Sequence, residues 1–172
     1  MPEGAETEFA VLVPLLEHSG EECILLTKRL DSLPQYSGQV SFPGGARDPE
    51  DADLAATAIR EAGEEVGIAP ARISIAAELP WQSTSLGHRV KPFLGRVTPG
   101  PLQPNPEEVE RVLYVPVSLV RSDPFRARGT WRDAEGRRRT TYTFEFDGLE
   151  VWGLTARILR DHFVLGRTSG IE

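Results

Sequence analysis

The sequence predicts a mixed α/β (α+β) fold, in which a central mixed sheet lies between helices. Several segments are apolar or alternate over the length of a strand, and two longer segments repeat apolar residues with the helical period. The chain has 172 residues, of which 40% are hydrophobic and 26% are charged. This length and composition are typical of one soluble domain with a sizeable core. We therefore expect residues 1–172 to form a single domain.

Strands and turns precede the first helix. Segments 8–18 and 22–30 are apolar runs joined by a turn, which predicts two strands. Residues 31–37 are expected to form a loop, and residues 38–45 a short strand that ends in a Gly-Gly turn. Asp51 or Asp53 can cap the following helix, which is expected to reach about Val66 and to end at Gly67.

The second half alternates strands and loops before a final helix. Strands are predicted at 72–80 and 87–97, and Pro92 indicates an edge strand or a bulge. The proline-dense segment after them is expected to be a loop. A strand is predicted at 109–117, a short helix at 118–121 and a further strand at 137–146. The last element is an amphipathic helix at 154–165.

Charge and composition exclude several classes of protein. The formal net charge of -7 argues against binding to nucleic acids or anionic membranes, which usually requires a basic surface. No segment approaches the ~20 apolar residues of a membrane span, and the N-terminus lacks signal-peptide features. We therefore expect a cytoplasmic protein. We expect it to be a monomer or a homodimer. The single cysteine, Cys23, excludes an intramolecular disulfide and a cysteine-based zinc site.

Three glutamates gather at the end of the first predicted helix. On a helical wheel Glu61, Glu64 and Glu65 lie together on the flank of the apolar stripe. Glu61 and Glu65 repel each other at i, i+4, and the negative end of the helix dipole opposes all three. A divalent cation would reverse the sign of these interactions, and carboxylate oxygens suit Mg²⁺ or Mn²⁺. The alternative is a surface helix whose glutamates pair with arginines such as Arg60.

The segment REAGEEVGI, residues 60–68, resembles the second half of the Nudix box, G-x5-E-x7-R-E-U-x-E-E-x-G-U, in which U is a bulky apolar residue. The spacing from Gly45 to Arg60 is one residue longer than the common one, so that Asp51 or Asp53 is the acid of the first half. The resemblance implies a Nudix-type α/β/α sandwich with a central mixed sheet. It also implies hydrolysis of a diphosphate joined to a nucleoside, with Mg²⁺ or Mn²⁺ as cofactor.

A second segment narrows the resemblance. LLTKRLDSLPQYSGQVSFPGG, residues 25–45, is similar to the signature of the coenzyme A diphosphatases within this superfamily, with Leu30 in place of a serine. VWGLTARIL, residues 151–159, is also similar to that subfamily. The implied products are adenosine 3',5'-bisphosphate (3',5'-ADP) and 4'-phosphopantetheine. Two alternatives stay open: a diphosphatase for another nucleotide, such as ADP-ribose or a nucleoside triphosphate, and a nucleotide-binding module that does not hydrolyse.

The resemblance also implies roles for residues of the box. Glu61 and Glu65 are expected to be the primary metal ligands, and Glu64 a third ligand or a ligand through water. Arg60 is expected to hold the glutamates in place, and Gly45 to offer a backbone carbonyl to the metal. Catalysis is thus assigned to Glu64, Glu65 and Arg60. The general base is one of these glutamates or an acid from another loop, with Glu107, Glu108 and Glu110 as candidates.

The upstream signature implies the residues that bind the substrate. Arg29 can grip a phosphate in bidentate fashion. The 3'-phosphate of coenzyme A requires cations, for which Lys28, Arg29 and the run 137–139 are available, although that run also fits a hairpin surface. The adenine ring needs an apolar or aromatic platform, which Phe42, Trp81 or Tyr142 could supply unless these rings pack in the core. The full set of expected substrate-binding residues is Arg29, Gly38, Gln39, Ser41 and Phe42.

Overall fold

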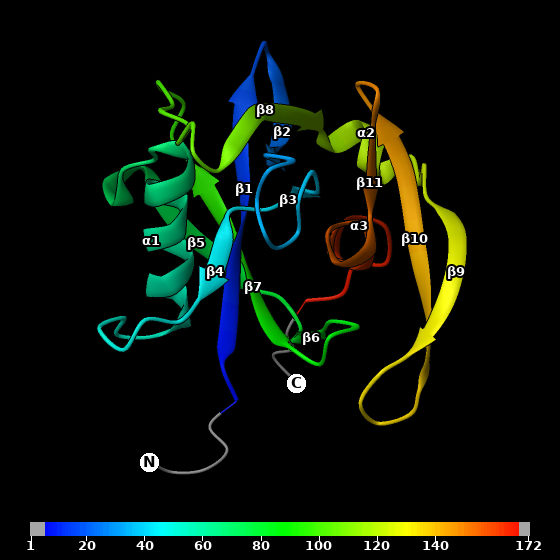
Figure 1. The fold of residues 1–172 in the computed structure, drawn as a ribbon. Coiled ribbons are helices and arrows are strands. Elements are labelled where there is room, and N and C mark those ends of the chain that lie inside the picture. Colours follow the sequence, from blue (N-terminus) through cyan, green and yellow to red (C-terminus); the bar gives the residue numbers. More distant parts are fainter. Residues whose placement is uncertain (1–5, 169–172) are drawn as a thin grey trace.

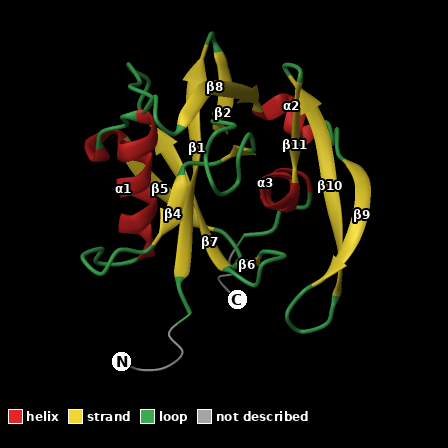
Figure 2. Ribbon diagram, viewed as in Figure 1, coloured by secondary structure: helices red, strands yellow, loops and turns green. Residues whose placement is uncertain are grey.

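A computed structural model describes residues 6–168, which form two sheets with helices between and beside them (Figure 1, Figure 2). The central sheet has eight strands and is mixed, because β1 runs parallel to β7 and antiparallel to β2. Its path is β3-β2-β1-β7-β5, while β4 pairs with β1, β6 with β7 and β8 with β2. Its strands are β1 (Glu8–His18), β2 (Glu21–Arg29), β3 (Val40–Ser41), β4 (Gly44–Ala46), β5 (Ile73–Glu78), β6 (Gln82–Ser83), β7 (Arg89–Val97) and β8 (Val109–Pro116).

A second, three-stranded sheet stands apart from the central one in the order β11-β10-β9. Helix α3 lies between the two sheets, and helix α1 lies on the other side of the central sheet (Figure 1). The mixed sheet with flanking helices confirms the predicted fold class. The strands of the second sheet are β9 (Arg126–Arg132), β10 (Arg138–Phe146) and β11 (Leu149–Trp152). The helices are α1 (Leu54–Val66), α2 (Val117–Arg121) and α3 (Gly153–Leu159), with a 3-10 turn (Pro70–Arg72) and a π-helical turn (Arg160–Val164).

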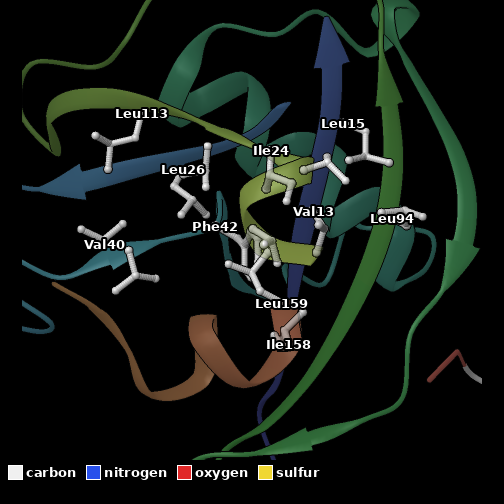
Figure 3. Close-up of a cluster of buried hydrophobic side chains, with 14 of the residues drawn as sticks. Val13, Leu15, Ile24, Leu26, Val40, Phe42, Leu94, Leu113, Ile158 and Leu159 are labelled. Carbon is white, nitrogen blue, oxygen red and sulfur yellow. The ribbon is translucent and has the colours of Figure 1, made fainter. Parts of the chain in front are cut away.

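The main hydrophobic core fills the space between the central sheet and α3. Side chains of β1 and β2 meet Ile158 and Leu159 of α3, and Phe42 points into the same cluster (Figure 3). A second cluster packs α1 against the opposite face of β1 and β7 through Ala58 and Ala62, which are fully buried. The small side chains let the helix approach the sheet closely, and this approach brings the end of α1 against β4.

The predicted helix is confirmed with its caps. The Asp53 side chain accepts a hydrogen bond from the Ala56 N–H at 2.8 Å, which satisfies one of the free donors of the first turn. Gly67 ends the helix with a φ of 72°, in the left-handed region that glycine adopts without strain. The sequence left Asp51 and Asp53 as alternative caps, and the structure assigns the cap to Asp53.

The structure corrects three details of the predicted elements. Strand β7 is an inner strand between β1 and β5, and Pro92 lies where its partner changes from β5 to β6. Gly44 and Gly45 do not form a simple turn, because they pair with Val11 and Ala10 as part of β4. The final helix is α-helical only to Leu159 and continues as a π-helical turn. None of the helices within residues 6–168 has the length and apolar character needed to cross a bilayer.

Candidate active site

The last two turns of α1 hold a buried carboxylate against β4. Glu65 is only 4% exposed, although it lies one turn from a second glutamate. Burial, followed by the charge of Glu61, raises the pKa of Glu65 to about 8. The Gly44 N–H donates to Glu65 Oε1 at 3.4 Å, and no cationic side chain of the described chain pairs with this carboxylate.

Glu61 lies beside Glu65 on the same face and meets the β4 backbone. Burial and the charge of Glu64 raise the pKa of Glu61. Any side chain at Gly45 would overlap the Glu61 carboxylate, because even a Cβ at this position collides with it. The glycine therefore allows the backbone of β4 to approach Glu61 directly.

Arg60 ties this end of the helix to the loop that follows β4. Its Nε and Nη2 bind the two oxygens of Asp51 at 3.0 and 3.1 Å. Its Nη1 donates to Glu61 at 3.2 Å and to Glu64 at 3.1 Å, and Nη2 also donates to the Ala46 carbonyl. The hydrogen bonds from Arg60 hold the pKa of Asp51 well below its usual range. Asp51, not Asp53, is thus the acid that supports Arg60.

The third glutamate points in another direction. The Glu64 side chain is 57% exposed and its carboxylate is held by Arg60. Within residues 6–168, no three His, Cys, Asp or Glu side chains are gathered closely enough to form a complete metal site by themselves. The structure therefore brings together Glu61, Glu65 and Gly45 of the expected metal ligands and leaves Glu64 at the rim.

The paired carboxylates fit a divalent cation. Both Glu61 and Glu65 are largely shielded from water, and each carries a pKa that burial and a like charge raise. A bound cation would relieve this repulsion, and a site made only of oxygen atoms suits Mg²⁺ or Mn²⁺. Glu108 adds to the negative potential, because its charge raises the pKa of both glutamates. Of the other acids considered from the sequence, Glu110 pairs with Lys28, and Glu107 is exposed.

A cavity of ≈ 460 Å³ opens between the central sheet and the second sheet, on the α3 side. Its wall includes Gly44, whose N–H donates to Glu65, and Gly45, which lies against the Glu61 carboxylate. Four expected substrate-binding residues line it: Arg29, Gln39, Ser41 and Phe42. Phe42 is also a core residue, since it is only 4% exposed. Gly38 is absent from the lining, and its φ of 68° and its closeness to Asp31 give it a role in the loop turn.

Two arginines of the cavity wall have no carboxylate partner. The Arg29 side chain makes no hydrogen bond or ion pair within residues 6–168, and its Nε is buried. Its positive charge lowers the pKa of Glu65, without an ion pair between the two side chains. Arg157 of α3 is the second, and its Nε is also buried without a partner in the described chain. Neither its position nor that of Trp131 and Trp152, which also line the cavity, was expected from the sequence.

Other candidates from the sequence are engaged elsewhere. Lys28 pairs with Asp31 and Glu110. In the run 137–139, Arg137 and Arg139 both bind Asp133 in the β9–β10 hairpin, which confirms the hairpin alternative. Of the aromatic rings considered for adenine, Phe42 lines the cavity but is a core residue, whereas Trp81 and Tyr142 lie outside the lining. Trp81 stacks with Arg89, and Tyr142 with Arg160.

The sequence of this chain is similar to a known protein family and to several of its members. A NUDIX domain model matches residues 6–138. The chain is 36% identical over 152 residues to a protein of Photorhabdus laumondii described as an uncharacterized Nudix hydrolase NudL, covering 87% of this chain and 80% of that one. A Yersinia pestis protein with the same description is 37% identical over 153 residues, covering 88% of this chain and 75% of that one.

Solved structures share the fold. A Caenorhabditis elegans Ap4A hydrolase in a binary complex superposes with a TM-score of 0.54 at 24% identity, covering 64% of this chain and 80% of that one. The NUDIX domain of Shewanella oneidensis NrtR, complexed with ADP ribose, gives a TM-score of 0.54 at 21% identity, covering 68% and 77%. At these identities the likeness concerns the fold alone.

Proposed function

This chain belongs to the NUDIX domain family of hydrolases, which act on phosphorus anhydrides, and from this premise we propose that it hydrolyses the diphosphate bond of coenzyme A and its derivatives. The products would be 3',5'-ADP and 4'-phosphopantetheine. One observation carries the choice of substrate. In a chain of net charge -7, one cavity presents two arginines without carboxylate partners, and its wall includes the two glycines that contact Glu61 and Glu65. Such a cavity suits a substrate with several phosphates and little other charge.

Residues Glu61 and Glu65, with the backbone of Gly45, would hold a Mg²⁺ or Mn²⁺ ion. When bound, such an ion neutralises charge on the diphosphate and lowers the pKa of a water molecule. Arg60 keeps the Glu61 carboxylate oriented, and Asp51 keeps Arg60 in place. These contacts fix the geometry before the substrate arrives, so that little reorganisation is needed during the reaction.

Two charged residues near the carboxylates would act on the substrate and the water. Arg29 lines the same cavity as Gly44 and Gly45, and we assign its guanidinium to the diphosphate oxygens, to which it can donate two hydrogen bonds. Glu108 is the loop acid whose charge reaches both glutamates, and we assign it the role of accepting the proton of the attacking water. Glu64, exposed at the rim, would contribute a ligand through water.

Replacing Arg29 by alanine is expected to raise KM by roughly 10-fold or more, the effect of losing charge-assisted hydrogen bonds. Because we assign Arg29 to the diphosphate, coenzyme A and dephospho-coenzyme A should be affected alike. Steady-state kinetics with both substrates measure this, and Arg96→Ala, which removes an exposed surface cation paired with Glu22, is the control. An unchanged KM for both substrates would remove Arg29 from the binding site.

The two glycines of β4 offer a matched pair of substitutions. Gly45→Ala places a methyl group against the Glu61 carboxylate, the movable end of a side chain. We expect a folded protein whose kcat is roughly 10²-fold lower, the loss associated with a displacement of about 1 Å. Gly44→Ala instead meets the Ala10 carbonyl at 2.5 Å and the Val11 Cα at 2.9 Å. It should lower the free energy of unfolding by about 1–3 kcal/mol. Thermal melts beside kinetics separate the effects, and equal stability losses in both variants would contradict this account of Gly45.

The proposed substrate is tested by an assay of coenzyme A beside ADP-ribose and nucleoside triphosphates, with Mg²⁺ and with Mn²⁺. The proposal predicts the highest kcat/KM for coenzyme A. A preference for ADP-ribose or a triphosphate would assign the cavity to another nucleotide. Nucleotide binding without turnover under either metal would instead identify a binding module.

A further inference from the structure

Arg157 is a cation held in place inside the cavity wall. Its Nη2 donates to the Ser83 carbonyl at 2.5 Å, and its guanidinium carbon lies 5.3 Å from the centre of the Trp131 ring. These two contacts come from the central sheet on one side and from β9 on the other. A side chain of high rotational freedom is thereby fixed in one orientation, as expected for a residue that binds a ligand.

The charge of Arg157 is not neutralised by an ion pair. Within residues 6–168 it makes no salt bridge, and burial lowers its pKa. The charges of Asp161 and Asp133 raise its pKa, but neither carboxylate forms an ion pair with it, and each pairs with another arginine. A buried guanidinium without a counter-ion is costly. An anion entering the cavity would offset that cost.

We propose that Arg157, held against Trp131 and Ser83, binds the phosphate of the substrate that is not cleaved, the 3'-phosphate of coenzyme A. This assignment rests on the proposed function. A phosphate monoester carries about two negative charges near neutral pH, and a guanidinium matches its oxygen geometry in bidentate fashion.

In this assignment the two arginines of the cavity wall bind different phosphate groups of the substrate. Arg29 lines the cavity together with Gly44 and Gly45, the two glycines that contact Glu65 and Glu61, so it is assigned to the diphosphate. Arg157 belongs to α3, on the other side of the central sheet from α1, which carries Glu61 and Glu65 (Figure 1). The Trp131 and Trp152 rings line the cavity as well, and Trp131, beside Arg157, offers apolar surface to the adenine.

Part of this wall, including Arg157 itself, lies beyond the end of the NUDIX domain match. The NUDIX domain match ends at residue 138, whereas Thr140, Thr141, Trp152 and Arg157 of the lining follow it. The general family match therefore covers the carboxylate end of the cavity and ends before most of the second sheet and α3. A group that selects one substrate among the nucleotides of the family is expected in such a segment.

Binding of two small ligands tests the assignment without turnover. Titration calorimetry compares 3',5'-ADP with 5'-AMP, which differ by the 3'-phosphate alone. The wild-type protein should bind 3',5'-ADP at least roughly 10-fold more tightly. Arg157→Gln should abolish this preference, whereas Arg160→Gln should keep it, since Arg160 stacks on Tyr142 outside the cavity. Equal affinities in the wild type, or a preference that survives Arg157→Gln, would overturn the proposal.

A second variant at the same position distinguishes a loss of phosphate binding from misfolding of Arg157→Gln. Arg157→Lys keeps the charge and the apolar stem but loses the bidentate geometry, so the preference for 3',5'-ADP should shrink several-fold. An unchanged preference would contradict the assignment.

Failure of the proposed function would give a different result. If the protein prefers 3',5'-ADP through Arg157 but does not hydrolyse coenzyme A, the phosphate site stands and the reaction is wrong. If Arg157→Gln leaves the ratio of kcat/KM between coenzyme A and dephospho-coenzyme A unchanged, the reaction stands and the site is wrong.

Discussion

Glu65→Gln is expected to lower kcat for coenzyme A hydrolysis by at least ~10²-fold, because it removes a charged ligand from the proposed cation site. The amide keeps the shape of the side chain and can still accept the hydrogen bond from Gly44. The fold should therefore persist, and circular dichroism should match the wild type. Glu17→Gln, at an exposed position on β1, is the control for the loss of one negative charge.

The same variant should be more stable than the wild type when no divalent metal is present. The pKa of Glu65 is raised from 4.5 to about 8, so the folded state binds this proton more tightly than the unfolded state does. Stability of the metal-free protein is then highest below about pH 4.5 for this group and falls as the pH rises towards 8. Removing the carboxylate removes that loss, and at pH 8 the melting temperature should rise by roughly 5 °C or more.

Added metal should reverse the order of the two proteins. Mg²⁺ or Mn²⁺ is expected to raise the melting temperature of the wild type, because a ligand that binds only the folded state stabilises it. Glu65→Gln should show little of this rise. Near-wild-type kcat in the variant, or the same metal-dependent stabilisation in both proteins, would contradict the role given to Glu65.

Asp51→Asn is expected to lower kcat roughly 10–100-fold, the usual range for a residue that orients metal ligands without contacting the metal. Asp51 receives two hydrogen bonds from Arg60, and Arg60 in turn holds Glu61 and Glu64. Without the carboxylate, the guanidinium loses its bidentate partner and its hold on the glutamates weakens. Kinetics at saturating substrate, over a range of metal concentrations, should show a raised metal requirement.

Asp53→Ala provides the matched control two residues away. Asp53 only caps α1, through the Ala56 N–H. Its loss should lower the free energy of unfolding by about 1 kcal/mol and leave kcat within about twofold of the wild type. If Asp53→Ala impaired catalysis while Asp51→Asn did not, the assignment of the two acids would be reversed.

The acidic helix was predictable because its signals are local. Periodicity placed Glu65 at the edge of the core, and the structure buries it there. Like charges at i, i+4 and a terminal Gly67 lie within one helix, so the sequence alone could indicate both the helix and its unfavourable charges. The choice between Asp51 and Asp53 was open, because both lie before the same helix and only the fold shows which one meets Arg60.

The far wall of the cavity was not predictable, because it depends on contacts between distant segments. Strand β9 is exposed along nearly all its length and shows no apolar alternation, so it gave no strand signal. Arg157 looks like an ordinary polar position of an amphipathic helix, and only its closeness to Ser83 and Trp131 shows that it faces the cavity. The resemblance of residues 151–159 to coenzyme A diphosphatases was the one signal for this wall, and it named no residue.

The most direct test of the account is a crystal structure with Mn²⁺ and an unreactive analogue of coenzyme A. The account predicts anomalous density for manganese between the carboxylates of Glu61 and Glu65 and beside Gly45. It also predicts the diphosphate against Arg29 and the 3'-phosphate against Arg157. Manganese bound elsewhere, with the two glutamates free of any ion while the analogue fills the cavity, would contradict it.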